Sequence, residues 1–342
     1  MRILLVATEL SSFGGIQRFS ASLNAAFVSL GHSVTIFESA RYPRWAGKGL
    51  AGLGLLHGGD PADVVWCAHP RLGALAVAIA GQRKVPVVIS THGYETWFPY
   101  PAHVRLALAR ADVVTAVSKY STALLGPIGR GAKLLPPTSD LYRLTAPEHE
   151  LVPARERSTV TLISRLGEGY KGIKEFAAAA ASLRATHPDL SFVASGRADP
   201  EVLSNATDWS SLEVIANPSD SELSNMYQRS AVVVLPSVAK RNERGRWIGG
   251  EGFGIVLLEA ALFGAVTIAS DEGACPELVA TLGNGVVTDP THEDLADALT
   301  ALMADVDLRE RLGARGRQVA WQRFSPAHFT ERVAGILEEL GC

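Results

Sequence analysis

Residues 249–260 read Gly-Gly-Glu-Gly-Phe-Gly-Ile-Val-Leu-Leu-Glu-Ala and place two acidic residues eight positions apart. Glycines flank Glu251, so the backbone there can turn sharply and approach a ligand closely. Glu259 stands in an apolar run that predicts a helix, and the free amides and positive dipole end at a helix start attract anions. We therefore expect Glu251 on a loop and Glu259 about two turns into the helix. The alternative is a glycine-rich turn into a core helix with incidental glutamates.

A carboxylate beside a helix N-terminus repels a lone phosphate. The arrangement of Glu251 and Glu259 therefore favours a ligand that carries hydroxyls as well as phosphates, as a nucleotide sugar does. Arg165 and Lys171 follow an expected strand, and two cations on a turn after a parallel strand suit a diphosphate. A solvated basic loop is the alternative for these two cations.

The wider sequence alternates short apolar strands with amphipathic helices, the pattern of parallel α/β sheets. Expected strands in the first half are 3–7, 33–38, 64–67, 87–90, 113–117 and 133–135, and those in the second half are 160–164, 190–195, 212–215, 232–235, 266–269 and 285–287. We expect two Rossmann-like, doubly wound domains that face a cleft, one at 1–145 and one at 158–325. Residues 146–157, with no clear periodicity, are the expected linker.

Composition agrees with a globular enzyme of 342 residues, 47% hydrophobic and 20% charged. The net charge of −3 argues against a nucleic-acid partner, which needs a basic surface. Cys67, Cys275 and Cys342 lack the spacing of a metal site or a disulfide framework, so a reducing cytosol is expected. The apolar runs 3–7 and 72–80 are too short for a signal peptide core and for a membrane span, respectively.

Further motifs occur in order around the glutamate segment. They are Gly14-Gly15-Ile16-Gln17, Thr91-His92-Gly93, Arg165-Leu166 with Lys171-Gly172, Pro236-Ser237 and Pro276-Glu277-Leu278-Val279. With the glutamate segment they resemble glycosyltransferase family 4, a group of retaining enzymes with the two-domain GT-B fold, over nearly the whole chain. The resemblance also implies that 1–145 is the acceptor-side domain, that 158–325 is the nucleotide-sugar-binding domain, and that the helical tail, 326–342, crosses back onto the first domain. Arg165 and Lys171 are six positions apart, where many relatives have five.

The resemblance implies roles for individual residues. His92 and Glu251 would act at the transferred sugar, although a lone histidine without these motifs is more often structural. The residues implied in donor binding are Gly14, Gly15, Arg165, Lys171, Gly252, Phe253, Gly254, Ile255 and Glu259. Glu259 would accept hydrogen bonds from the ribose. Same-face substitution is favoured over a covalent intermediate on Glu251.

The implied reaction is retaining transfer of a hexose from a nucleoside-diphosphate sugar to a hydroxyl of a glycan, lipid-linked or small-molecule acceptor. The basic segment 239–248 resembles that of mannosyltransferases in the family and favours GDP-mannose over UDP-glucose or UDP-GlcNAc. The segment is interpreted as a flap, an acceptor contact or a solvated loop. The alternatives are a nucleotide-sugar epimerase or phosphorylase of the same fold and a catalytically silent nucleotide-sugar binder.

No cofactor and no metal are expected. Asp305-Val306-Asp307 imitates a metal motif, yet we interpret it as part of a charged helix face. A second basic and aromatic cluster, 41–50, is read as a surface loop, with contact to a membrane interface as the alternative. The expected location is therefore the cytoplasm, with a peripheral contact at the inner membrane face left open.

Overall fold

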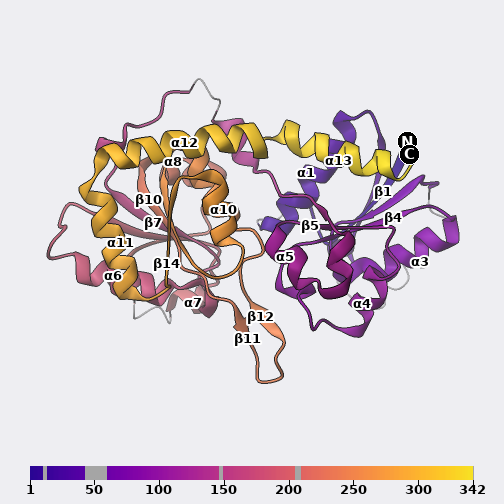
Figure 1. Cartoon of the computed structure of the whole chain (residues 1–342), viewed down its shortest axis with the longest axis horizontal. Coiled ribbons are helices and arrows are strands. Elements are labelled where there is room, and N and C mark those ends of the chain that lie inside the picture. Colours follow the sequence, from indigo (N-terminus) through magenta and orange to yellow (C-terminus); the bar gives the residue numbers. More distant parts are fainter. Residues whose placement is uncertain (11–13, 43–59, 146–148, 205–208, 342) are drawn as a thin grey trace. The chain divides into compact units, whose positions relative to one another are not determined.

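The computed structural model describes residues 1–10, 14–42, 60–145, 149–204 and 209–341. The chain divides into two compact units (Figure 1). The first unit comprises Met1–Asp140, Asn242–Trp247 and Phe324–Cys342, and the second comprises Leu141–Arg241 and Ile248–Arg323. Residues 43–50 of the second basic cluster lie outside the described residues, and so does Cys342.

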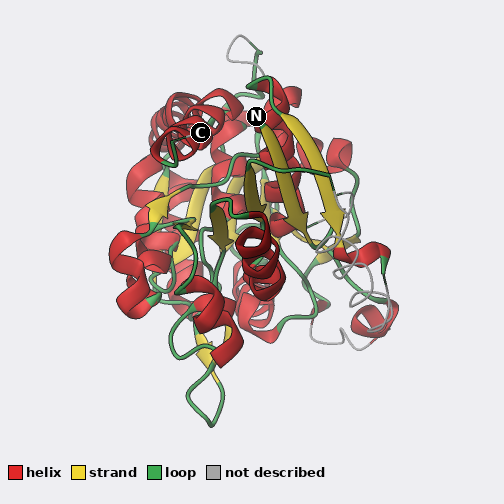
Figure 2. Ribbon diagram, turned by 90° about the vertical axis from the view of Figure 1, so that its right-hand side faces the viewer, coloured by secondary structure: helices red, strands yellow, loops and turns green. Residues whose placement is uncertain are grey.

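The first unit contains a six-stranded parallel sheet in the order β2-β1-β3-β4-β5-β6. Its strands are β1 (Arg2–Ala7), β2 (Ser33–Glu38), β3 (Val64–Cys67), β4 (Val87–Thr91), β5 (Val113–Ala116) and β6 (Lys133–Leu134). Its helices are α1 (Gly15–Ser29), α3 (Gly73–Arg83), α4 (Ala102–Leu108), α5 (Lys119–Leu124) and α13 (Pro326–Glu339). The strands lie between helices, as Figure 2 shows. All four residues of β3 are buried, which explains its uninterrupted apolar sequence.

The last helix of the chain, α13, completes the core of the first unit. Phe329 packs edge-on against Phe19 of α1, with ring centroids 5.6 Å apart. Val333, Ile336 and Leu337 follow at helical spacing and are buried in the same cluster. The helical tail therefore belongs to the first unit, although more than 180 residues of sequence separate it from that unit's sheet.

The second unit contains another six-stranded parallel sheet, in the order β14-β13-β10-β7-β8-β9. Its strands are β7 (Thr159–Ile163), β8 (Ser191–Gly196), β9 (Glu213–Ala216), β10 (Ser230–Leu235), β13 (Val266–Ser270) and β14 (Gly285–Thr288). Its helices are α6 (Ile173–Leu183), α7 (Pro200–Ser204), α8 (Asp220–Arg229), α9 (Ile255–Leu262), α10 (Cys275–Leu282), α11 (His292–Ala304) and α12 (Val306–Phe324). The predicted fold class, two doubly wound parallel-sheet domains, is confirmed.

The strand order of the second unit reverses at β7, which lies between β10 and β8. Ligands of doubly wound sheets bind at the carboxyl ends of the strands at such a reversal. The loop after β7 carries Arg165 and Lys171, and the loop after β10 leads to Glu251. The topology therefore brings together two motifs about 80 residues apart in the sequence.

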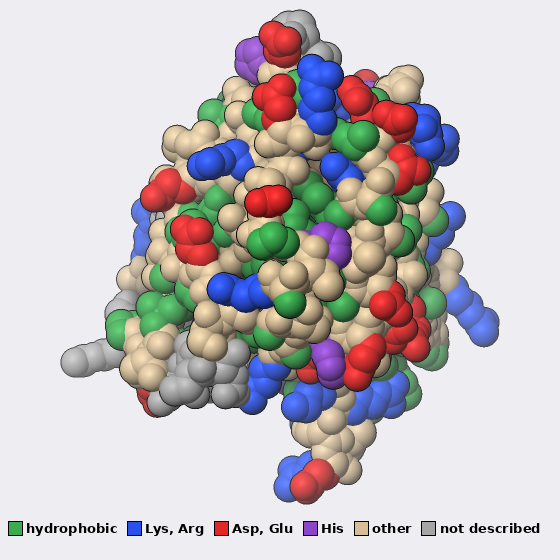
Figure 3. Space-filling view, turned by 90° about the vertical axis from the view of Figure 1, so that its left-hand side faces the viewer, with side chains coloured by type: hydrophobic (Ala, Val, Ile, Leu, Met, Phe, Trp, Pro, Cys, Tyr) green, Lys and Arg blue, Asp and Glu red, His purple; other side chains and the backbone are tan. Residues whose placement is uncertain are grey.

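The basic segment 239–248 is a β-hairpin, formed by β11 (Lys240–Arg241) and β12 (Trp247–Gly249). Lys and Arg side chains gather around it in the space-filling view of Figure 3. Trp247 clusters with the first unit, where its indole lies edge-on to Trp97 at 5.1 Å between centroids. Its Nε1 donates to the carbonyl of Phe98 at 3.2 Å.

The interpretation of Asp305-Val306-Asp307 as part of a helix face holds for Val306 and Asp307, which lie in the first turn of α12 with Asp307 exposed, but not for Asp305. Asp305 ends α11 with an extended backbone, and its Oδ1 accepts a hydrogen bond from the amide of Leu308 at 2.8 Å. The residue therefore caps the start of α12, a role that aspartate commonly plays. In the described part of the chain, no helix combines the length and apolar character needed to cross a bilayer.

Candidate functional site

The loop between β7 and α6 is fixed by a glycine at its end. Gly172 has φ 70° and begins α6, and a Cβ there would lie 2.3 Å from the carbonyl oxygen of Pro236. A side chain at this position is excluded by both the backbone angle and the close approach. The loop after β7 therefore rests directly on the loop after β10, and Lys171 is held at this junction.

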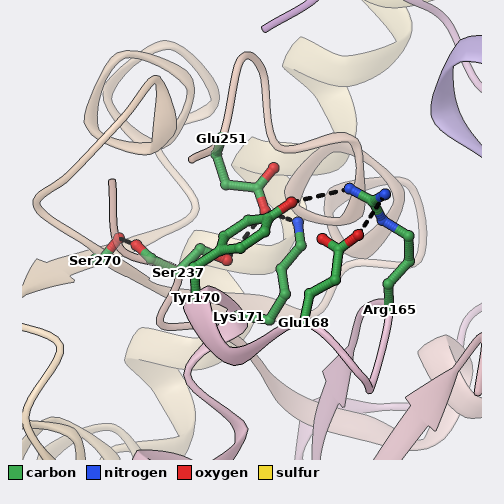
Figure 4. Close-up of polar contacts among 7 residues, drawn as sticks. All are labelled: Arg165, Glu168, Tyr170, Lys171, Ser237, Glu251 and Ser270. Carbon is green, nitrogen blue, oxygen red and sulfur yellow. Dashed lines mark hydrogen bonds and ion pairs between the residues drawn. The ribbon is translucent and has the colours of Figure 1, made fainter. Parts of the chain in front are cut away.

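Glu251 forms an ion pair with Lys171 at this junction (Figure 4). Lys171 Nζ forms an ion pair with Glu251 Oε1, and Ser237 Oγ donates to the same oxygen at 3.0 Å. Both charged side chains are largely buried, with 10% and 14% of their surfaces exposed. The backbone oxygen of Glu251 accepts from the amide of Ala274 at 2.9 Å, which fixes the loop from the other side.

Two opposing effects set the pKa of Glu251. Burial acts to raise it, while the charge of Lys171 and the hydrogen bonds from Lys171 and Ser237 act to lower it. The balance leaves the pKa below its ordinary value, so Glu251 is a carboxylate at neutral pH. The site thus contains a buried anion and a buried cation that neutralise each other.

Arg165 has different partners from Lys171. Its guanidinium contacts Glu168 Oε1 at 2.6 Å and donates to the hydroxyl of Tyr170 at 2.9 Å. Burial, together with the neighbouring carboxylates, raises the pKa of Tyr170, so its hydroxyl stays protonated. The Tyr170 ring also lies against Lys171, with Nζ 4.9 Å from the ring centroid. Tyr170 therefore contacts both cations, Arg165 through its hydroxyl and Lys171 through its ring.

Glu259 lies on α9 and is held by a tyrosine. Its Oε2 accepts from the hydroxyl of Tyr227 on α8 at 2.8 Å, and the residue is buried. Gly254 precedes the helix with φ 87°, so α9 begins at Ile255. Glu259 is consequently one turn into the helix, and the expectation of two turns is wrong.

The remaining residues of the second unit that the sequence predicts to bind the donor lie in the segment between Glu251 and α9. Gly250 and Gly254 have positive φ angles of 140° and 87°, whereas Gly252 does not. Phe253 is buried. The side chain of Cys275, at the start of α10, is also buried, and burial raises its thiol pKa well above the ordinary value. A buried neutral thiol is consistent with a core residue rather than a nucleophile.

The first unit holds the other predicted residues. His92 follows β4, and its Nε2 lies 2.6 Å from the carbonyl oxygen of Ala68, so this nitrogen carries the proton. The backbone amide of His92 donates to Glu95 Oε1 at 3.1 Å. Burial lowers the pKa of His92 despite the opposing charge of Glu95, which keeps the imidazole neutral. Gly14 caps the start of α1, and Gly15 is its first residue.

The sequence did not assign roles to three side chains that support the predicted residues. Ser237 and Tyr227 contact the two glutamates, and Glu168 pairs with Arg165. Ser237 was visible in a motif, and Glu168 lies in the same loop as Arg165. Tyr227 is 32 positions from Glu259 and gave no local signal. Among the described residues, no cluster of three or more His, Cys, Asp or Glu side chains could hold a metal ion.

The sequence pattern of the family described as "Glycosyl transferases group 1" matches residues 148–319. The chain belongs to this family. This glycosyltransferase is 32% identical over 311 residues to the GDP-mannose-dependent alpha-(1-6)-phosphatidylinositol monomannoside mannosyltransferase of Mycolicibacterium smegmatis, covering 83% of this chain and 79% of that protein. The protein of the same name from Mycobacterium tuberculosis is 30% identical over 278 residues, covering 75% of this chain and 70% of that protein.

Solved structures agree on the fold. Sucrose-phosphate synthase from Thermosynechococcus elongatus superposes with a TM-score of 0.76 at 18% identity, covering 99% of this chain and 98% of that one. Anabaena HepE in complex with UDP-glucose gives a TM-score of 0.75 at 16% identity, covering 99% and 100%. The glycosyltransferase thus has the GT-B fold, and the family inferred from the sequence motifs is confirmed.

Proposed function

We propose that this glycosyltransferase transfers a mannosyl group from GDP-mannose to a hydroxyl, with retention of the anomeric configuration. The observation that carries the proposal is the buried Lys171–Glu251 ion pair at the strand-order reversal of the second unit. GDP-mannose is favoured because relatives about 30% identical are named for it. The basic hairpin of β11 and β12 is consistent with that choice.

Each residue of the second-unit site has a role in this proposal. Arg165 and Lys171 bind the diphosphate, exchanging part of their contacts with Glu168 and Glu251 for phosphate oxygens. The charge that develops on the departing GDP is then met by these cations in a partly buried setting, where electrostatic stabilisation is strong. Glu251 and the segment from Gly252 to Ile255 bind the sugar, and Glu259 binds the ribose.

The first unit supplies the remaining roles. His92, neutral and with its proton on Nε2, contacts the sugar through its ring. Gly14 and Gly15 allow close approach of the donor phosphates or the acceptor at the start of α1. For the acceptor we propose a hydroxyl of a sugar or polyol carried on a phospholipid, since the relatives are named for phosphatidylinositol monomannoside.

The test measures release of free nucleoside diphosphate from GDP-mannose, UDP-glucose and UDP-GlcNAc, with and without phosphatidylinositol monomannoside. We expect GDP release that depends on the acceptor, and a product whose new linkage is α by nuclear magnetic resonance. Binding of GDP-mannose without turnover on any hydroxyl acceptor would favour a silent binder. Conversion of the free nucleotide sugar without an acceptor would favour an epimerase.

Independence from divalent metal ions is part of the proposal. Arg165, Lys171 and the start of α9 together provide the positive charge that a metal supplies to a diphosphate in other enzymes. We expect turnover to be unchanged by EDTA and not raised by manganese or magnesium. Activity that EDTA abolishes and a divalent ion restores would overturn this assignment of the phosphate contacts.

A further inference from the structure

A cavity of about 540 Å³ lies in the second unit, lined by the segment Leu151–Arg157, by Gly264 and by one face of α12. None of the donor-site side chains described above is among its lining residues. Its volume falls within the range of small-molecule pockets, about 300–1,000 Å³. The proposed reaction makes no use of it.

The cavity contains a buried cation whose charge is not neutralised by the described part of the chain. Arg157 is 5% exposed, and its hydrogen bonds go to two backbone carbonyls, Val152 at 2.8 Å and Ser230 at 3.4 Å. Burial and the nearby charge of Arg317 lower the pKa of Arg157 to about 10, so it remains charged at neutral pH. Burying a charge without an opposite charge is costly.

Two glycines lie on the side of the cavity next to this guanidinium. Gly264 has φ 67°, and a Cβ there would lie 3.7 Å from Arg157 Nη2. Gly313 of α12 is equally close-packed, because a Cβ there would lie 2.2 Å from the carbonyl oxygen of Gly264. Both positions line the cavity, and the lack of a side chain at each lets α12 pack directly against the backbone at Gly264.

A second donor lines the same cavity. The Nε1 of Trp321 is buried and has no hydrogen-bond partner among the residues that the structure describes. Its indole is fixed edge-on against Tyr142 at 4.8 Å between centroids, and the Tyr142 hydroxyl is itself bound to the carbonyl of Ala320 at 2.6 Å. A buried N–H without an acceptor is uncommon in a folded protein, and an oxygen of a bound ligand would satisfy this one.

We propose that this cavity binds an organic phosphate monoester, with the phosphate on Arg157, Arg317 and the Trp321 indole and an apolar body against Leu151 and the Trp321 ring. A dianion is favoured over a carboxylate because two guanidiniums line the cavity, while the lining carboxylate, Glu310, is exposed to solvent. The apolar wall adds affinity for a ligand larger than inorganic phosphate.

The experiment titrates the full-length protein with phenyl phosphate by isothermal calorimetry, with GDP present to fill the donor site. Repeating the titration in the Lys171→Ala background excludes phosphate captured at the donor site. We expect saturable one-site binding, with inorganic phosphate bound roughly tenfold more weakly because it lacks the apolar body. Binding of inorganic phosphate as tight as that of phenyl phosphate would overturn the apolar part of the site.

Matched variants on α12 locate the binding. Arg317→Gln is expected to weaken phenyl phosphate roughly tenfold or more, because it removes a charged hydrogen bond. Arg311→Gln removes an equal charge from an exposed position on the same helix that does not line the cavity, and it should leave affinity unchanged. Trp321→Phe should weaken binding several-fold with the ring retained. No saturable binding in the millimolar range, or equal losses in the two arginine variants, would overturn the proposal.

Discussion

At the scale of single residues, the two glutamates differ in their partners, and this difference predicts different phenotypes. Glu251 faces a cation and a hydroxyl, whereas Glu259 faces a tyrosine hydroxyl. Glu251→Gln should leave GDP binding intact while turnover of GDP-mannose falls, because the sugar contact is lost. Glu259→Gln should weaken GDP and GDP-mannose alike, by about 1–3 kcal/mol, because the ribose is common to both. Calorimetry and initial rates measure the two effects.

Tyr227→Phe is the control for the role of Glu259. It removes the hydroxyl that holds Glu259 but leaves the carboxylate, so the loss of GDP affinity should be smaller than in Glu259→Gln. If Glu251→Gln weakened GDP as much as GDP-mannose, the placement of the sugar beside Glu251 would be untenable. If neither glutamate variant changed binding or rate, the motif would be structural.

A pair of histidines in the first unit predicts a loss of stability in acid. Burial, with the repulsion that His92 exerts once both rings are protonated, lowers the pKa of His69 to about 4. In the unfolded chain, the same histidine binds a proton near pH 6.5. The stability that neutral His69 gives the folded protein is therefore complete above that pH and is lost as pH falls toward about 4. His69→Asn keeps the side-chain acceptor for the amide of Arg71. The free energy of unfolding, measured with urea, should fall less between about pH 7.5 and pH 5 in His69→Asn than in the wild type.

The acid prediction depends on the histidine being the group that titrates. The charges near His69 are Glu95, which raises its pKa, and Arg71 and His92, which lower it. An identical loss of stability in the wild type and in His69→Asn would assign the acid sensitivity to other groups.

At the scale of elements, the start of α6 depends on a single glycine. Gly172→Ala places a Cβ against the backbone of Pro236 in a left-handed conformation, and we expect a loss of about 1–3 kcal/mol. GDP affinity should fall as well, because Lys171 precedes this residue. Gly169→Ala is the matched control in the same loop, since a Cβ there meets nothing within 4 Å. Equal stability of the two variants, measured by urea unfolding, would contradict the strain argument.

The elements show what the sequence could predict. The predicted bounds of strands 33–38 and 64–67 match the observed ones. Residues 64–67 are an uninterrupted apolar run, and 33–38 mix polar with β-branched and aromatic residues, which favour strands. The sequence does not predict the hairpin of β11 and β12 as strands. Its residues are mostly charged, and apolar residues do not alternate along it. The position of Glu259 in α9 was misjudged because the left-handed Gly254, which sets the helix start, leaves no signal beyond being a glycine.

The contacts of the site were less predictable than its members. The motifs predict Lys171 and Glu251 separately as ligand-binding residues. Their direct ion pair depends on the order of β7 and β10 in the sheet, and the sequence does not encode that order locally. The same holds for Tyr227, which reaches Glu259 only because α8 and α9 pack on neighbouring strands of one sheet. Local pattern thus indicates the chemistry, and topology determines the partners.

At the scale of the whole molecule, the chain leaves the first unit after Asp140 and supplies its last core helix from the C-terminus. Phe329 of α13 is 1% exposed within the core that α1 covers. Phe329→Ala should cost about 3–5 kcal/mol, a typical value for a buried phenylalanine. Hydrogen exchange measured by mass spectrometry should show the loss of protection in peptides of the first unit.

Phe176→Ala provides the matched comparison, because Phe176 of α6 is 0% exposed in the core of the second unit. It should reduce protection in the second unit and leave β1 and β3 protected. The pair of variants tests whether α13 stabilises the first unit specifically, because the same side chain is removed from each core. Equal loss of protection across both units in either variant would show that the chain unfolds as a single cooperative block. The tail would then contribute to the stability of the whole molecule rather than to the unit whose core it completes.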